Sequence, residues 1–447
     1  MIRSTAWKLW QTLSDRSRVP GYMQQLQSFH TLPAKQSHKA TADALRTLMR
    51  KAGANVPYYQ GLYKEHQVNV DADDIFAELT KLPPMTKALM EAQGDKLHSS
   101  VPGRRPYRNS SGGSTGKPAI FRQDRDYQDW SAANKALFAT WAGWQPGQGW
   151  LKIWGAPKDI FGGGNPLKKA VRAWALNESV VNCYQTNDDS WRACAEQMRR
   201  NKPAVIESYA TAMDDFTEFL AREKISVPAP AGVITSAGRL ESEVRQRVRD
   251  TLGCPALDRY GSREVGDMSC ACPEHNGLHL NGLVHYLEIL DPAGNPCPPG
   301  VEGEIFVTLL TNHTMPLLRY QIGDMGIWAA GPCACGRTSP ILAEVSGRVT
   351  DSVVTPTRRL NGVALATSLV EIDGLRQFQY LQSANKDLTL SIVFTANLTA
   401  EQREATLASI KERMDKLFLD EIPFVIKEVE SIPKTATGKY RYVISEL

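Results

Sequence analysis

Apolar and polar residues along the chain form patterns that predict helices alternating with strands. Residues 38–65 carry apolar side chains at helical spacing from Ala44 to Met49, which predicts a helix followed by a turn at Val56-Pro57. Further along, the same reasoning predicts helices over 127–141, 190–200 and 239–253, strands over 150–155, 204–208 and 231–238, and a strand running into a loop over 254–267. Such alternation favours a parallel sheet.

The pattern changes between residues 283 and 330. Two apolar strands there flank the Pro- and Gly-rich segment DPAGNPCPPG, which predicts an antiparallel hairpin. Beyond Gly347 the chain returns to a strand over 387–396, a helix over 399–419 and a strand over 424–433. We therefore predict an α/β protein with two domains. The first, residues 1–347, has parallel α/β sheets and a β-rich subdomain at about 268–345, and the second, residues 348–447, is a small α+β domain.

Composition and charge indicate which classes of protein the chain can belong to. With 447 residues the chain exceeds one ordinary core, and its 42% hydrophobic and 22% charged residues with a net charge of +4 are typical of a globular protein. No partner nucleic acid is indicated. The sequence has no 18-residue apolar run and its first residues hold no continuous apolar stretch, so we expect neither a membrane span nor a signal peptide, and a cytoplasmic location.

A run of small residues, RNSSGGSTGKPAIFR, stands out at residues 108–122. Its backbone N–H groups, hydroxyls and one lysine suit an anion such as phosphate. It is not a Walker A loop, because Ser111 stands where the first Gly is needed and Pro118 follows the lysine in place of a hydroxyl residue. The residues alone leave two interpretations, a phosphate cradle or a flexible surface loop.

Four further segments follow this loop in order: DRYGSREVGD (258–267), PLLRYQIGD (316–324), SGRV (346–349) and PKTATGK (433–439). NVPYYQ and LPPMTK precede the loop, and CPEHNGLH follows the glutamate motif. In this order and spacing the motifs resemble those of adenylate-forming enzymes, in particular the phenylacetate–CoA ligase family and its relatives from polysaccharide clusters. The resemblance covers roughly residues 40–445 and implies that family's fold, with a small C-terminal domain that is mobile.

The resemblance implies an ATP site. A carboxylate that attacks the α-phosphate meets another anion, so such a site must supply positive charge and oriented donors. The loop would close over the β- and γ-phosphates with Ser111, Gly112, Gly113, Ser114, Thr115, Gly116 and Lys117. Glu264 would hold Mg²⁺, Tyr260 would lie against the adenine, and Gly261 and Ser262 would lie near the α-phosphate. Asp324 would accept hydrogen bonds from the ribose hydroxyls, and Arg348 would add a cation.

Lys439 would by itself be read as an exposed residue of a terminal tail. The resemblance instead implies that it reaches the cleft and bridges the substrate carboxylate and the phosphate during adenylation. The small domain would rotate between adenylation and thioester formation about a hinge at Thr350 and Asp351. Many relatives have Asp or Lys where this chain has Thr350, so the chain departs from the family's pattern at the pivot.

Cysteine and histidine residues cluster in two segments, CACPEHNGLH and CACG. These segments permit one tetrahedral zinc site, and buried free thiols are the alternative. The resemblance implies a structural zinc bound by Cys272, His279, Cys333 and Cys335, with Cys270 and His275 as alternates. Four protein ligands leave no open position, so such a zinc would fasten the β-rich subdomain without acting in catalysis.

The acyl pocket is expected around Tyr209, Ser236, Ala237 and Gly238, where most relatives have Glu in place of Gly238. We predict an enzyme that uses ATP and Mg²⁺ to adenylate a small carboxylic acid, an aromatic one, and passes the acyl group to a thiol of CoA or of an acyl carrier protein's phosphopantetheine. Two alternatives stay open: transfer to an amine, and a non-catalytic scaffold of the same fold. A monomer and a homodimer are both compatible with the sequence.

Overall fold

The computed structural model describes residues 5, 7, 10, 17–110, 120–154, 166–183, 187–274, 277–348, 353–357, 359–360, 365, 368–369, 372–396, 398–419, 421–432 and 441–446. No helix among these residues is both long and apolar enough to cross a bilayer. The N-terminal part begins with α2 (Val19–Phe29), α3 (Ala34–Asn55), α4 (Pro57–Glu65), α5 (Ile75–Thr80), α6 (Lys87–Gln93) and the short 3₁₀ helix η1 (Gly94–Leu97). A two-stranded hairpin, β1 (Tyr107–Ser110) and β2 (Ile120–Gln123), then leads into α7 (Arg125–Trp141).

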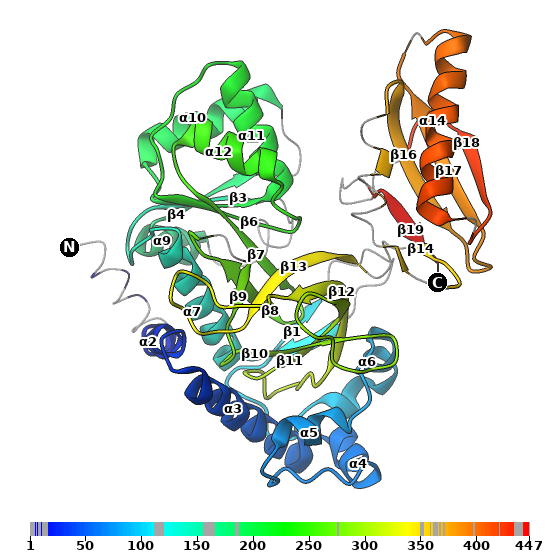
Figure 1. Cartoon of the computed structure of the whole chain (residues 1–447). Coiled ribbons are helices and arrows are strands. Elements are labelled where there is room, and N and C mark those ends of the chain that lie inside the picture. The colour runs from blue at the N-terminus through cyan, green and yellow to red at the C-terminus, as the bar shows by residue number, and fades with distance from the viewer. Residues whose placement is uncertain are drawn as a thin grey trace.

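One large mixed sheet follows, with eleven strands in the order β10-β11-β12-β13-β9-β8-β7-β6-β5-β3-β4 (Figure 1). Its parallel strands are β3 (Trp150–Trp154), β4 (Glu178–Asn182), β5 (Val205–Tyr209), β6 (Gly232–Ser236) and β7 (Ala256–Ser262). The antiparallel part is β8 (Gly266–Ala271), β9 (Leu278–Leu280), β10 (His285–Leu290), β11 (Glu302–Leu309), β12 (Tyr320–Trp328) and β13 (Ile341–Arg348). The α/β class and the parallel sheet are confirmed, and the β-rich region continues that sheet through β7 and β8.

Helices cover both faces of the parallel strands, since successive side chains of a strand point to opposite faces. On one face Val205, Ile234 and Leu257 pack into the same core as α7 and α2. On the other, Ile206, Val233 and Ala256 pack against three helices. These helices are α10 (Asp188–Asn201), α11 (Ala210–Arg222) and α12 (Ser242–Leu252), while α9 (Pro166–Leu176) precedes β4 (Figure 1).

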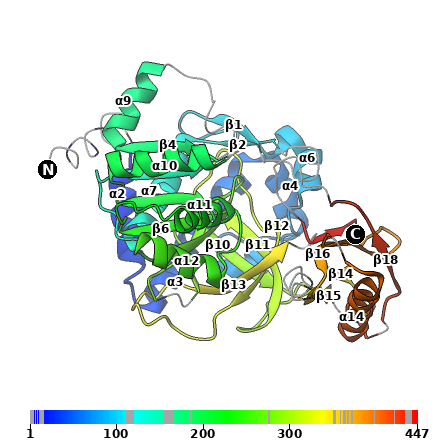
Figure 2. The ribbon, with the colours of Figure 1, turned by 90° about the horizontal axis from the view of Figure 1, so that it is seen from above.

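The residues after 352 form a smaller unit with an apolar core of its own. Its sheet has the order β18-β17-β16-β19, with β16 (Leu375–Gln382), β17 (Leu388–Phe394), β18 (Phe424–Glu428) and β19 (Val443–Ser445). Alongside lie α14 (Ala400–Phe418) and the short pair β14 (Val353–Val354) and β15 (Arg359–Leu360). Figures 1 and 2 show this unit, in orange and red, beside the large sheet. The predicted strand-helix-strand order is confirmed here.

Three local predictions were wrong. The turn predicted at Val56-Pro57 is one extended residue followed by α4, because proline keeps the residue before it out of the helical region yet suits the first helical turn itself. The predicted helix over 239–253 begins only at Ser242. Before it, the Leu240 N–H donates to Asp258 at 3.4 Å and Arg239 pairs with Glu344 at 2.6 Å, which holds this stretch outside the helix.

The third concerns residues 254–267, where the predicted loop is a tight β-hairpin between β7 and β8. Gly261 pairs with Asp267 and Ser262 with Gly266. A Cβ on Gly261 would lie 2.6 Å from the Gly266 carbonyl oxygen, so the two strands approach this closely only because residue 261 is glycine.

A buried charge network links this hairpin to the parallel strands. The Glu207 Oε1 on β5 lies 2.9 Å from Lys135 Nζ of α7 and 2.8 Å from Arg259 Nη2 of β7. Arg259 Nε in turn lies 3.3 Å from Asp267 Oδ1 on β8. Burial alone would raise the pKa of Glu207, but the charges of Lys135 and Arg259 lower it far below its usual value, so the carboxyl group stays ionised.

We expect Glu207→Gln to lower the free energy of unfolding by about 3–5 kcal/mol, because it leaves the buried Arg259 and the partly exposed Lys135 facing one carboxylate with little change in side-chain volume. Urea unfolding followed by tryptophan fluorescence measures this loss. Glu196→Gln is the matched control, since Glu196 pairs with Arg199 at the surface and exposed pairs contribute little. Equal stability of the two variants would contradict a structural role for the network.

Candidate active site

Two of the predicted nucleotide-binding side chains meet at the centre of the large sheet. The Tyr260 hydroxyl on β7 donates a hydrogen bond to Asp324 Oδ2 on β12 at 2.7 Å. Asp324 is also the register partner of Arg348 on β13. The side chain of Arg348 lies outside the described residues. The second, third and fourth motifs therefore converge at one place although they are far apart in the sequence.

Glu264 lies in the turn between β7 and β8, next to this meeting point. Its backbone carbonyl and that of Arg263 both accept hydrogen bonds from Gln123 Nε2, at 3.2 and 3.3 Å. Ser262 carries a buried Oγ that has no hydrogen-bond partner among the described residues. A buried hydroxyl without a partner is unfavourable in the free protein and is expected where a polar ligand completes the site.

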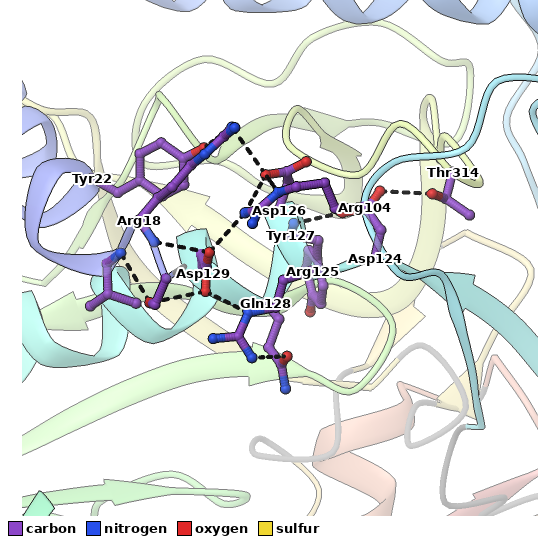
Figure 3. Close-up of polar contacts among 12 residues, drawn as sticks. Arg18, Tyr22, Arg104, Asp124, Arg125, Asp126, Tyr127, Gln128, Asp129 and Thr314 are labelled. Carbon is purple, nitrogen blue, oxygen red and sulfur yellow. Dashed lines mark hydrogen bonds and ion pairs between the residues drawn. The ribbon is translucent and has the colours of Figure 1, made fainter. Parts of the chain in front are cut away.

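The hairpin β1–β2 carries the Ser/Gly-rich loop between its two strands. Its base is held by Thr314, whose Oγ1 accepts from the Gly103 N–H at 2.8 Å and donates to Asp124 Oδ2 at 2.7 Å (Figure 3). Asp124 also caps α7, because its Oδ1 accepts from the Tyr127 N–H at 2.8 Å. Thr314 precedes β12, so the strand that bears Asp324 and the base of the loop are tied together.

A neighbouring cluster of charges at the start of α7 is structural. The buried carboxylate of Asp129 accepts from the Arg18 N–H and from Arg104, each at 3.0 Å, and forms an ion pair with Arg125 Nε at 3.0 Å (Figure 3). Asp126 pairs with Arg104 at 2.7 Å and with Arg18 at 3.2 Å. These groups satisfy one another, and together they attach the N-terminal helix α2 to α7.

The expected acyl pocket lies at the carboxyl ends of the parallel strands, the edge where α/β sheets bind ligands. Tyr209 and Ser236 are register partners at the ends of β5 and β6. Trp154, at the end of β3, packs its ring 4.2 Å from that of Tyr209. Ala237 has a positive φ of 63°, and a Cβ on Gly238 would have only the Ala210 Cβ within 4 Å, at 3.7 Å, so the missing glutamate of the relatives leaves open space.

Four side chains expected at a zinc site do gather in the antiparallel part of the sheet. One ligand atom from each of Cys272, His279, Cys333 and Cys335 lies within 4.8 Å of the others. The Sγ atoms of Cys272 and Cys333 are 3.5 Å apart, and His279 Nε2 is 3.3 Å from Cys335 Sγ. Both spacings suit donors about 2.0–2.3 Å from a common tetrahedral ion.

The second nitrogen of His279 has its own partner. Nδ1 lies 3.2 Å from Ser339 Oγ, which leaves Nε2 directed at the three thiols. Cys270 is not part of this group. The alternate ligand His275 lies outside the described residues.

Several predicted site residues lie outside the described residues, so their places stay predictions. They are Ser111, Gly112, Gly113, Ser114, Thr115, Gly116 and Lys117 of the loop, Thr350 and Asp351 of the hinge, and Lys439. The structure also adds three residues that sequence reasoning missed: Gln123, Thr314 and Trp154. Only Trp154 carried a usable signal, as an aromatic residue at the end of a predicted strand.

Known proteins resemble the chain along most of its length. Residues 353–446 match the family model of the CapK C-terminal domain. The phenylacetate-coenzyme A ligase of Thermus thermophilus is 26% identical over 72% of this chain and 73% of its own length. Protein CapK of Staphylococcus aureus is 21% identical over 88% of this chain and 86% of its own.

A solved structure of 2-hydroxyisobutyryl-CoA ligase in the postadenylation state aligns with a TM-score of 0.70 and 19% identity, covering 94% of this chain and 91% of that one. The fold and the convergence of motifs thus define an adenylate-forming enzyme. The sequence similarities support an adenylate-forming, phenylacetate–CoA ligase-like family with CapK-type members.

Proposed function

We propose that the protein activates a small carboxylic acid with ATP and transfers the acyl group to a thiol, with CoA as the acceptor or else a carrier-protein phosphopantetheine. The acid's carboxylate oxygen attacks the α-phosphorus, the bond to the β-phosphate breaks, and pyrophosphate leaves. The thiol then attacks the acyl carbon and AMP leaves. The observation that carries this proposal is the 2.7 Å contact between Tyr260 and Asp324, which joins two nucleotide motifs beside the strand of Arg348.

Each step of this reaction requires particular residues. Residues 111–117 would cradle the β- and γ-phosphates, and Asp324 would accept from the ribose hydroxyls. Glu264 would hold Mg²⁺, which supplies positive charge against the phosphate oxygens. Ser262, buried and without a partner among the described residues, would donate toward the reacting phosphate or carboxylate.

Lys439 would supply the remaining cation during adenylation, as a positioned point charge between the carboxylate and the α-phosphate. Rotation about Thr350 and Asp351 would then withdraw it and admit the thiol. We place the boundary between the two domains near Gly347, because the hinge must lie between the ATP motifs and Lys439.

The acid is proposed to be aromatic. Trp154 and Tyr209 stand together at the carboxyl ends of their strands and offer aromatic surface, with ring centroids 4.2 Å apart and planes tilted by 44°. Gly238 leaves space beside them instead of a carboxylate. Both features suit an uncharged planar group better than an amino or a second carboxyl group.

Acid-dependent exchange between ATP and pyrophosphate tests the proposal, since this half-reaction needs no acceptor. We expect exchange with at least one aryl acid from a panel of aryl, fatty and amino acids, and we expect Lys439→Ala to reduce it by about 10²–10³-fold or more with the fold intact. Lys416→Ala, an exposed lysine of the same unit paired with Glu412, should keep full exchange. Normal exchange by Lys439→Ala would contradict its role, and no exchange with any acid would favour the scaffold.

Competition between CoA and an amine as acceptors then separates thioester from amide formation.

We also propose that Cys272, His279, Cys333 and Cys335 bind a structural zinc, supported by their mutual distances and by the Ser339 contact that orients His279. Elemental analysis of the purified protein should find about one zinc per chain, as expected for a closed four-ligand site. Cys333→Ser should lose the metal, while Cys194→Ser, buried in a separate core, should retain it. Wild-type protein without zinc would favour the alternative of free thiols.

A further inference from the structure

Gln123, the last residue of β2, makes hydrogen bonds with all four of its amide positions. The side chain is buried, with 1% of its surface exposed. Its Oε1 accepts from the Tyr107 hydroxyl at 3.2 Å and from Asn109 Nδ2 at 3.0 Å, both on the opposite strand β1. Its Nε2 donates to the carbonyls of Arg263 and Glu264 at 3.3 and 3.2 Å.

This arrangement requires an amide. A carboxylate has no donor for the two carbonyls, and an apolar chain of the same length would remove the hydrogen bonds of four polar groups. Only an amide presents two acceptor and two donor positions at once. The residue type is therefore set by the polar groups around it and not by packing.

The bonds join two elements that the sheet does not connect. β1 and β2 form a separate two-stranded sheet, whereas the turn with Glu264 belongs to the eleven-stranded one. The base of the hairpin is held by other contacts, namely Thr314 with Gly103 and Asp124, and Asn312 Nδ2, which donates to the Arg122 carbonyl at 2.9 Å. Gln123 is thus not needed to close the hairpin, and its distinct contribution is the link to the Glu264 turn.

We propose that Gln123 is a positioning residue that fixes the hairpin β1–β2, whose two strands flank the Ser/Gly-rich loop in the sequence, against the turn that bears Glu264. This inference rests on the proposed function, in which the loop holds the terminal phosphates and Glu264 holds the Mg²⁺ bound to them. The loop and Glu264 must bind the same nucleotide at the same time. A change in the distance between them therefore weakens the Mg²⁺-dependent part of ATP binding. Gln123 touches neither ATP nor metal in this account and acts through the backbone of Arg263 and Glu264.

Isothermal titration calorimetry of ATP binding, with Mg²⁺ and with EDTA, tests the link without knowledge of the acid. Wild-type protein should bind ATP more tightly with Mg²⁺, and in Gln123→Met this gain should fall by about tenfold, as for partners that orient metal ligands. Binding in EDTA should change much less. Gln128→Met is the matched control, because Gln128 is exposed and bonds only the Arg125 side chain, at 3.1 Å.

The outcomes are distinct. An unchanged Mg²⁺ gain in folded Gln123→Met would overturn the positioning role, even if its melting temperature falls. A wild-type protein that gains nothing from Mg²⁺ would overturn the proposed function and this inference with it. Should Gln123→Met fail to fold, Tyr107→Phe removes a single donor to Oε1 and carries the same test, with a smaller loss expected and an unchanged gain again contradicting the role.

Discussion

The pairing of the buried Arg259 and the partly exposed Lys135 with two carboxylates is the constraint on which the site depends. Arg259 and Asp267 stand at the two ends of the segment that holds Tyr260, Ser262 and Glu264. Glu207 and Lys135 anchor this pair to β5 and α7. A buried charge without its partner is strongly unfavourable, so the network permits one register of β7 and β8 against the parallel strands. The nucleotide motif is therefore presented by a hairpin whose ends are fixed by charge.

Around that hairpin, polar contacts with residues of other motifs determine how the neighbouring elements are oriented. Asp324 contacts this hairpin through Tyr260, and the hairpin β1–β2 contacts it through Gln123. Thr314 ties the base of β1–β2 to the segment before β12. Two of these contacts are 2.7 Å long and the third is 3.2 Å. They explain how motifs dispersed over more than two hundred residues form one site on a sheet whose strands are mostly antiparallel here.

Much of this could be predicted from local patterns. Helical spacing and apolar runs correctly predicted α7, α10, α14 and the parallel strands β3, β5, β6 and β7, although β4 was missed. The order of motifs pointed to the family. Val56-Pro57 was misread as a turn because proline stops one helix and starts another equally well. The Glu207 network, the contact of Tyr260 with Asp324 and the amide of Gln123 depend on partners distant in sequence, and no local pattern marks them. Cys272, His279, Cys333 and Cys335 were grouped because their spacing matched a family pattern, and the structure does bring these four side chains together.

The central claim is that the acid's own carboxylate oxygen attacks the α-phosphorus of ATP. Supplying the acid identified by exchange with ¹⁸O in its carboxyl group, together with ATP and CoA, and weighing the nucleotide product by mass spectrometry tests this directly. The account predicts AMP that carries a single ¹⁸O atom, because the attacking oxygen stays on phosphorus when the thiol displaces AMP. Unlabelled AMP, or ¹⁸O in orthophosphate together with ADP, would contradict it.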